Sequence, residues 1–286
     1  MSRISIITLF ILMGVQFSIS SQAAEDIKRY EIENTEVKPL KSSSNGKEYE
    51  LYIQLPSSYH TSASSYPVIF LNDTPFSFPI ASGVVRLLGG NDIGEVILVG
   101  ISYSKGDKVG ISRTRDYTPT FAPDETSYYS LESKKVSGQS DNYIEFISGQ
   151  VLPYVKAHYR ADFSNKIFVG HSFSGLLGVS ILLKHPELFD HYIIGSPSLW
   201  YDNRVVFSLE EAYSKNHKYM KANVYMYVGD SEDTEDHKMI YDIISFEKVL
   251  KSRNYSGLNV KSEVLKNATH HSAFSILFQK ALLEIL

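Results

Sequence analysis

The sequence predicts a single α/β domain with a mostly parallel central sheet and helices on both faces. Short apolar runs rich in β-branched residues recur along the chain, and such runs are typical of strands buried on both faces. Helical patterns lie between these runs, and the alternation favours parallel strands joined by helices. The 286 residues, 43% hydrophobic and 21% charged, are long enough to bury one such core.

The first residues, 1–23, are predicted to be a signal peptide. Arg3 supplies positive charge ahead of ISIITLFILMGV, an apolar run with the length of a signal-peptide core and too short for a clear membrane span. Small residues surround an expected cleavage after Ala23 or Ala24, and an uncleaved membrane anchor is the alternative. We therefore expect a periplasmic or secreted domain over 24–286, without membrane association after cleavage. The chain has no cysteine, so this exported form would depend on its core rather than on disulfides.

The expected strands follow one another from an amphipathic first strand to a polar last one. The first, EYELYIQLP, alternates apolar residues on one face and follows SSNGK, a sequence typical of a hairpin turn. The later strands are expected in YPVIFLND, EVILVGISY, KIFVG, HYIIGSPS, NVYMYVGD and the more polar NVKSEVLKN. Helices are expected at about 141–159, 174–185, 236–253 and 272–285.

The segment KIFVGHSFSGLLGVSILLKHPELF combines a strand, a tight turn and a helix around Ser172. A serine on such a turn exposes its hydroxyl at the carboxyl edge of the sheet, at a helix N-terminus whose N–H groups favour a developing oxyanion. Gly170 supplies one small residue that the tight turn needs, whereas Ser174 stands where glycine is usual. Ser172 is therefore the predicted nucleophile, and the alternative is a serine that only caps the helix.

A nucleophilic serine needs a base and an orienting acid, and on this kind of turn the acid and then the histidine follow it in the chain. The strand NVYMYVG runs into an acidic loop in which Glu232 is the expected acid, with Asp230 and Asp233 as rivals. The base is expected after the last strand, where His270 and His271 precede the final helix. Adjacent histidines point in different directions, and no clear third ligand accompanies them, so we expect neither a metal nor another cofactor.

Together these landmarks resemble the putative-esterase branch of the α/β-hydrolases, which includes siderophore trilactone esterases and feruloyl esterases. The resemblance covers nearly the whole mature chain and rests on YPVIFLNDTPFSF, SRTRDYTP, VGHSFSGL, FDHYIIGSPSLWYD, VGDSE and THHSAF. It implies an α/β-hydrolase fold and a serine esterase that works through an acyl-enzyme. In that reaction Ser172 would be the nucleophile, His270 the base and Glu232 the acid, and the Phe173 backbone N–H would be the first oxyanion donor.

The second oxyanion donor is where the sequence departs from the family pattern. Members typically have Asp-Gly after the second strand, but here the run is Asp73-Thr74-Pro75, and proline has no N–H to donate. Either the alignment to the family pattern slips by one residue, or Thr74 or Phe76 supplies the donor, and we expect Thr74. The departure, together with Ser174, favours one alternative: a catalytically weak hydrolase-fold protein that binds a ligand.

The expected partner is a small-molecule ester, either a siderophore trilactone or an aryl ester. A feruloyl esterase or a simple carboxylesterase is the alternative. The insertion around 103–140 and Trp200 would wall the cleft, and Arg113 and Arg115 are candidates for an anionic or catecholate substrate. For the two arginines a salt bridge, or for Arg115 with Asp116 a clamp on the loop, is an equal alternative. The net charge of −4 gives no indication of nucleic-acid binding.

Overall fold

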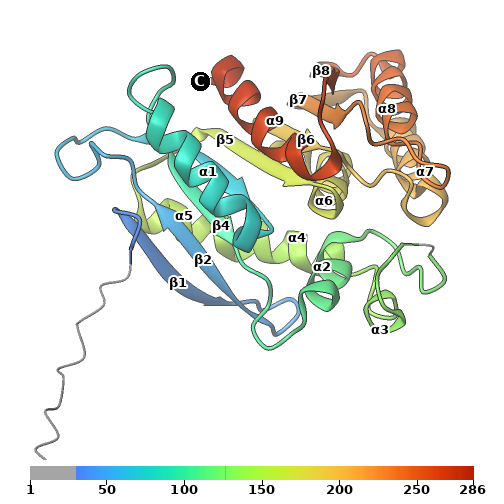
Figure 1. Ribbon diagram of the computed structural model, residues 1–286, viewed down its shortest axis with the longest axis horizontal. Helices are drawn as coiled ribbons and strands as arrows, with labels where there is room; N and C mark the ends of the chain where they lie inside the picture. The colour runs from blue at the N-terminus through green and yellow to red at the C-terminus, as the bar shows by residue number, and fades with distance from the viewer. Residues whose placement is uncertain (1–29, 126) are drawn as a thin grey trace, which may run out of the picture. The chain divides into compact units, whose positions relative to one another are not determined.

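The computed structural model describes residues 30–125 and 127–286, and those from Glu33 onward form one compact unit. The predicted signal peptide, with its cleavage after Ala23 or Ala24, lies outside the described residues. Within them, eight strands form one sheet in the order β1-β2-β4-β3-β5-β6-β7-β8 (Figure 1). None of the helices in these two ranges is both long enough and apolar enough to cross a bilayer.

Strands and helices alternate along the chain, as the sequence predicts. The strands are β1 (Thr35–Lys41), β2 (Glu48–Gln54), β3 (Tyr66–Leu71), β4 (Ile97–Ile101), β5 (Ala161–His171), β6 (His191–Gly195), β7 (Tyr219–Gly229) and β8 (Ser256–Leu265). The helices are α1 (Thr74–Leu88), α2 (Val109–Tyr117), α3 (Leu131–Lys134), α4 (Ser140–Phe146), α5 (Leu152–His158), α6 (Phe173–Lys184), α7 (Tyr201–Asn216), α8 (Met239–Arg253) and α9 (His270–Ile285). A π-helical turn at Ile147–Val151 joins α4 to α5, and a 3₁₀ turn at Pro186–Leu188 follows α6.

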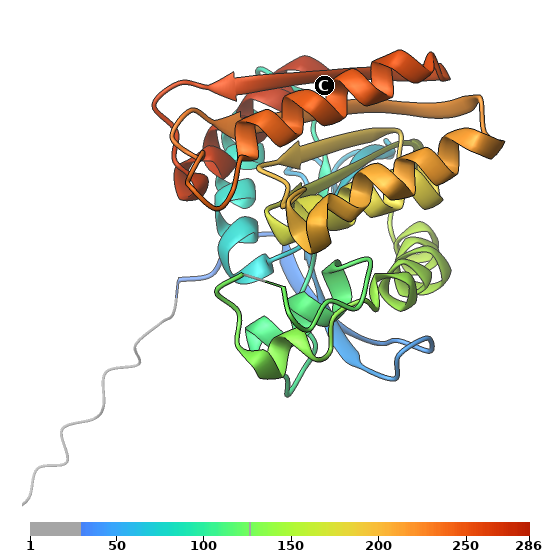
Figure 2. The same ribbon diagram turned by 90° about the vertical axis from the view of Figure 1, so that its right-hand side faces the viewer.

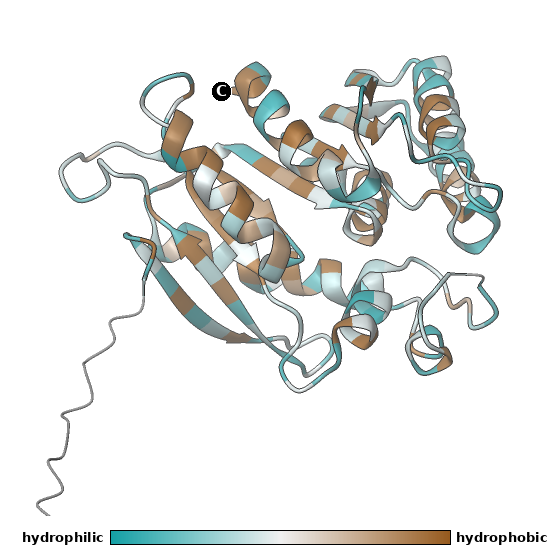
Figure 3. Cartoon of the chain, in the orientation of Figure 1, coloured by the Kyte–Doolittle hydropathy of each residue, from teal (hydrophilic) through white to brown (hydrophobic). Residues whose placement is uncertain are grey.

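The sheet is parallel from β4 to β8, and only β2 runs antiparallel to its neighbours β1 and β4. The hairpin between β1 and β2 turns where SSNGK predicts it, with Gly46 at a φ of 72°, a conformation that glycine adopts at little cost. In β2, Tyr49, Leu51 and Ile53 are fully buried, which confirms the alternation in the sequence. The strand at the edge, β1, is largely hydrophilic (Figure 3).

Helices cover both faces of the sheet. On one face α1 and α9 pack over β3, β5 and β6, and their contact residues include Phe78, Leu277 and Phe278. On the other face, α4, α5 and α6 form a larger apolar cluster with α7 and α8. The helices α7 and α8 lie side by side in Figure 2. Ion pairs of Glu210 with Arg253 and of Arg204 with Asp242 join α7 to α8.

Four helices of the described residues, α1, α2, α3 and α7, lie in segments that the sequence did not predict as helical. In α1, Pro75 and Pro79 obscure the pattern, although Pro75 is tolerated because it lies in the first turn. Residues 202–204, at the start of α7, have positive φ values. The first turn of this helix is therefore irregular, and its sequence does not show a regular helical period. The predicted helix at 174–185 begins at Phe173 and ends at Lys184, because His185 precedes Pro186 and such a residue avoids the helical conformation.

Close contact between α6 and β5 depends on Gly170. A Cβ atom added there would lie 2.1 Å from the backbone oxygen of Ser174, well inside van der Waals contact. Backbone atoms cannot rotate away as a flexible side chain can, so any side chain at this position would push helix and strand apart.

We expect Gly170→Ala to lower the thermal midpoint by about 3–10 °C, because it overpacks a backbone contact. Gly83→Ala is the matched control, since nothing lies within 4 Å of the added carbon in α1, and this change should be neutral or stabilising by up to about 1 kcal/mol. Thermal unfolding followed by circular dichroism measures both variants. Equal midpoints for the two would contradict the proposed crowding at Gly170.

Candidate active site

Ser172 lies on the turn between β5 and α6, in a backbone conformation that few residues other than glycine adopt. Its φ is 61° and its ψ is −120°. Its N–H donates to the Gly195 carbonyl at 2.9 Å, and its own carbonyl accepts from the Leu176 N–H at 2.9 Å. Such strain is of the order of 1–3 kcal/mol and persists because the surrounding contacts hold it. This is the strand-turn-helix geometry that the sequence predicts.

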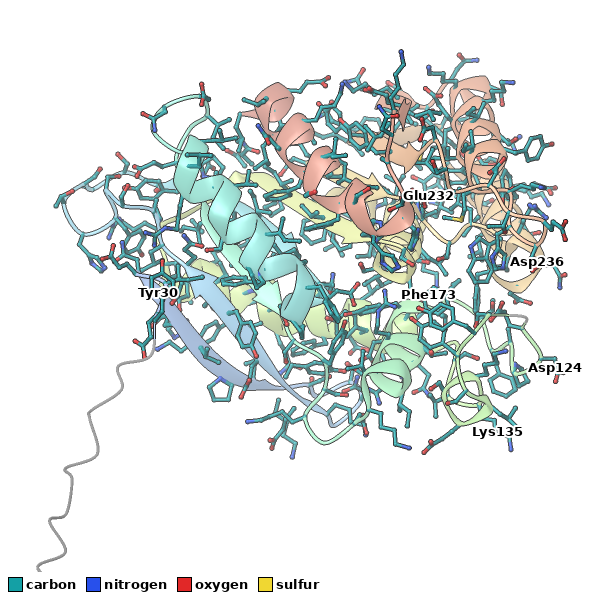
Figure 4. The ribbon with its side chains drawn as sticks, viewed as in Figure 1. Tyr30, Asp124, Lys135, Phe173, Glu232 and Asp236 are labelled. Atoms are coloured by element: carbon teal, nitrogen blue, oxygen red, sulfur yellow. The ribbon has the colours of Figure 1, made fainter. Side chains whose placement is uncertain are left out.

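Two helix N-termini meet at this edge of the sheet. Because β3 and β5 are adjacent and parallel, with Leu71 paired to Val169, Thr74 and Ser172 each follow the paired residues by three positions. Thr74 begins α1 and Phe173 begins α6, and an N–H at the first position has no acceptor within its own helix. Figure 4 labels Phe173 at the start of α6.

The loop after β3 has few backbone donors to offer. The Phe76 N–H already donates to the Asp73 carbonyl at 2.9 Å, and Pro75 has none. Of the two candidates left open by the sequence, Thr74 is therefore the one whose N–H is not used within the loop.

Glu232 is the carboxylate that contacts His270. His270 Nδ1 lies 2.6 Å from Glu232 Oε2, and Glu232 is 5% exposed. The turn after β7 brings it back, with the Glu232 N–H donating to the Gly229 carbonyl at 3.3 Å. Its second oxygen, Oε1, accepts from the Ser196 hydroxyl at 2.7 Å and from the Gly229 N–H at 2.6 Å. Figure 4 labels Glu232 in this loop.

The two rival carboxylates are engaged elsewhere. Asp230 accepts from the backbone N–H groups of Asn267, at 2.9 Å, and Ala268, at 3.3 Å, and so tethers the loop before α9. Asp233 accepts from the Ile240 N–H at 2.8 Å near the start of α8. Position in the loop thus separates the three, because the tight turn directs only the third residue back across the sheet edge.

The charge on Glu232 is stabilised by its hydrogen bonds. Burial by itself would raise the pKa of this carboxyl group, but the bonds from His270, Ser196 and the Gly229 N–H lower it below its usual value. Glu232 is therefore ionised at neutral pH and can orient the His270 imidazole and stabilise its charged form.

A second histidine, which the sequence analysis did not single out, packs against the first. The rings of His171 and His270 are 4.6 Å apart. Burial, helped by the neighbouring His270, lowers the pKa of His171 to about 3, so its ring is neutral under ordinary conditions. His271, by contrast, is exposed, and its ring centre is 6.0 Å from that of His270.

The two arginines predicted as substrate contacts are both bonded to protein carboxylates. Arg113 binds Asp73 through Nε at 2.7 Å and Nη2 at 3.1 Å. Burial alone would lower the pKa of Arg113, but the Asp73 carboxylate raises it well above its usual value. Arg115 is 5% exposed and donates to Asp116, Asp107 and Ser104. This is the loop clamp that the sequence left as an equal alternative, and it argues against substrate contact by Arg115.

Trp200 lies beside the nucleophile turn. Its ring is 6.1 Å from that of Phe173 and stacks on His237 at 4.0 Å. It borders a cavity of about 430 Å³ together with Phe121 and Asp202. The lining of this cavity does not include Ser172 or His270, so the prediction that the insertion and Trp200 wall the substrate cleft stays a prediction. Among the residues described, no group of three or more His, Asp or Glu side chains is arranged to hold a metal ion.

The sheet order, the strained serine turn and the paired carboxylate and histidine at its edge are those of an α/β-hydrolase. The chain belongs to the esterase family described as "Putative esterase", which matches residues 42–286.

Individual relatives are named as esterases. The ferri-bacillibactin esterase BesA of Bacillus subtilis is 24% identical over 262 residues, which cover 88% of this chain and 90% of that protein. The siderophore triacetylfusarinine C esterase of Aspergillus fumigatus is 27% identical over 60% of this chain and 59% of its own. Among solved structures, the BES protein from Bacillus cereus superposes with a TM-score of 0.78 at 25% identity, covering 91% of this chain and 98% of that one. The protein is accordingly a carboxylic ester hydrolase.

Replacing Glu232 by glutamine should destabilise the protein at neutral pH and much less in acid. Its pKa is lower in the folded chain than the unfolded value of about 4.3, so its stabilisation is complete above that value and is lost as the pH falls through the folded pKa. Urea unfolding between pH 7 and about pH 3.5, which is about one unit below the unfolded pKa, measures the free energy of unfolding of wild type and of Glu232→Gln.

Glu235→Gln is the control, since this exposed carboxylate lies in the same loop. It should differ little from wild type at either end of the range. A deficit of Glu232→Gln that stays constant with pH would show that the hydrogen bonds do not depend on its charge.

Proposed function

We propose that the protein hydrolyses esters by a Ser172–His270–Glu232 triad through an acyl-enzyme, with a siderophore trilactone or a related aryl ester as substrate. The observation that carries this proposal is the 2.6 Å hydrogen bond between buried Glu232 and His270, beside a serine held on the strained turn. Catalysis explains this combination better than a purely structural role does, because strain at Ser172 costs free energy and is typical of functional sites.

The hydrogen bond supports a distinct role for each of the two imidazole nitrogens. Nδ1–H donates to ionised Glu232, which leaves Nε2 of His270 as the base. Ser172 Oγ attacks the ester carbonyl while Nε2 takes its proton. As the tetrahedral intermediate collapses, Nε2–H gives that proton to the leaving alcohol. Water then attacks the acyl-enzyme by the same route, and the acid product and free Ser172 are released.

The negative oxygen of each tetrahedral intermediate would be bound by two backbone donors, the N–H groups of Phe173 and Thr74. Both are first residues of helices, and the paired register of β3 and β5 supports their convergence on one point. Each donor is worth a factor of about 10²–10³ in rate. Pro75 is then compatible with activity, because the donor precedes it.

The names of similar proteins and the aromatic side chains near Ser172 both support this substrate class. Relatives named as esterases of siderophores cover most of the chain or its larger part. In the insertion the rings of Tyr128 and Tyr129 stack on each other, and the buried ring of Phe173 lies 4.9 Å from Tyr129 and 6.1 Å from Trp200. The exposed ring of Tyr128 and the half-buried ring of Trp200 suit planar aromatic arms of a substrate, and we propose Trp200 as one contact. The same stacking suits a feruloyl ester, which is the second candidate.

We also propose that residues 1–23 are removed on export, which would place the mature enzyme in the periplasm or outside the cell. The proposal is supported by the charged and apolar pattern of this segment in the sequence.

Ser172→Ala should abolish hydrolysis of a p-nitrophenyl ester while the thermal midpoint changes little, because the half-buried hydroxyl contributes chemistry rather than packing. Purified wild type and variant are compared on p-nitrophenyl acetate, a trilactone siderophore, a feruloyl ester and short acyl esters. A trilactone turned over best supports the siderophore assignment. Activity retained by the variant would disprove the nucleophile, and no turnover by wild type of any ester would favour a ligand-binding protein.

The two adjacent histidines should behave differently. His270→Ala is expected to reduce kcat to the level of Ser172→Ala, because no other imidazole is bonded to Glu232. His271→Ala serves as the matched control and should keep most of the activity, since its ring is exposed and contacts His270 only at 6.0 Å. Steady-state kinetics on the p-nitrophenyl ester decides between them, and the reverse order would overturn the assignment of the base.

A further inference from the structure

We infer that Ser174 is a positioning residue for the oxyanion hole: its hydroxyl joins the Thr74 donor loop to the nucleophile turn through the Asp73 carboxylate. The inference rests on the proposed function, since it assigns a role in that reaction. It concerns a position where the sequence has serine in place of the usual glycine.

The Ser174 hydroxyl is buried, 1% exposed, and bonded on both sides. It accepts from the His171 backbone N–H at 2.8 Å. Its single hydrogen can go to Asp73 Oδ2 at 2.9 Å or to the His171 carbonyl at 2.8 Å. The charged acceptor makes the stronger bond. The hydroxyl therefore links the residue before the nucleophile to the residue before the Thr74 donor.

Asp73 is held in a way that suits this link. It is the residue before α1, with a φ of 58°, yet its side chain makes no hydrogen bond that caps the helix. Instead its two oxygens accept from Arg113, from the Tyr103 hydroxyl at 2.8 Å and from Ser174. The orientation of Asp73 fixes the direction of the next peptide, whose N–H belongs to Thr74.

Thr74 needs such an anchor because it precedes Pro75. Residues before proline avoid the helical conformation, yet α1 begins at Thr74. Without a fixed Asp73, this peptide would have more freedom to turn its N–H away from the developing charge. The family pattern has two departures here, Ser174 and Pro75. Ser174 bonds to the Asp73 carboxylate, and Pro75 follows the Thr74 peptide that Asp73 anchors.

Arg113 makes a carboxylate tolerable at this place. A bare negative charge beside an oxyanion hole would oppose the charge that develops there. The guanidinium forms a two-pronged pair with Asp73 and lies over the Phe173 ring at 5.8 Å, so the pair is neutral as a unit. Arg113 then acts through Asp73 rather than on the substrate.

The test compares Ser174→Ala with Ser180→Ala. Both remove a buried hydroxyl from α6, but the Ser180 hydroxyl bonds only to the Leu176 carbonyl, at 3.0 Å. We expect Ser174→Ala to lower kcat about 10-fold with KM within about 2-fold, which is less than the outright loss of a donor because Thr74 remains in place. A phenylboronic acid, which mimics the tetrahedral intermediate, should bind more weakly by a similar factor.

A second variant separates this role from simple structural damage. Asp73→Asn keeps the shape but removes the charge, so adding Ser174→Ala to it should cost less than the same change costs in wild type. Ser174→Gly, which restores the usual residue, should lose activity as the alanine variant does.

The inference is overturned if Ser174→Ala matches Ser180→Ala in kcat and boronate affinity, if Ser174→Gly is more active than wild type, or if the two changes are additive. All these outcomes require an active wild type. A wild-type enzyme inactive on every ester would instead refute the proposed function.

Discussion

The candidate site depends above all on the parallel pairing of β3 with β5. This pairing sets Leu71, the last residue of β3, beside Val169, which is 98 positions away and two residues before the end of β5. Each strand then turns directly into a helix, and the two first residues present backbone N–H groups with no acceptor of their own. A shift of this register by one residue would separate the proposed Thr74 donor from the turn that carries Ser172.

Backbone strain is concentrated where the site lies. Asp73, Ser172 and Ser196 all have positive φ values, and none of them is glycine. Each follows a strand of the parallel sheet and makes a hydrogen bond with a residue that follows or ends a different strand: Asp73 with Ser174, Ser172 with Gly195, and Ser196 with Glu232. The rigid sheet and the helices on both faces hold these turns, so the strain fixes side-chain directions instead of relaxing.

Two buried carboxylates carry negative charge close to the reacting centre, and the fold treats them differently. Glu232 receives hydrogen bonds from a hydroxyl, a backbone N–H and His270, and its Oε2 faces the imidazole that would become cationic in the proposed reaction. Asp73 is paired with Arg113. The Glu232 charge thus faces the imidazole that it would stabilise in the proposed reaction, whereas the Asp73 charge, which positions the backbone, is neutralised by Arg113.

The sequence by itself determined the α/β class, the positions of most strands along the chain and the serine on its turn, because the apolar period and the small residues of a tight turn are local signals. It also predicted Glu232 as the acid among three neighbouring carboxylates and His270 as the base among two histidines. The tertiary structure shows which carboxylate contacts His270, since the path of the loop after Gly229 brings Glu232 rather than Asp230 to it. The bond of Arg115 to its neighbour Asp116 was one of the two alternatives that the sequence offered. The pairing of Arg113 with Asp73 and the link from Ser174 to Asp73, by contrast, could not be predicted, because each joins residues that are far apart in the sequence. Contacts of that kind depend on where strands pair and end in space, which no local pattern of residues encodes.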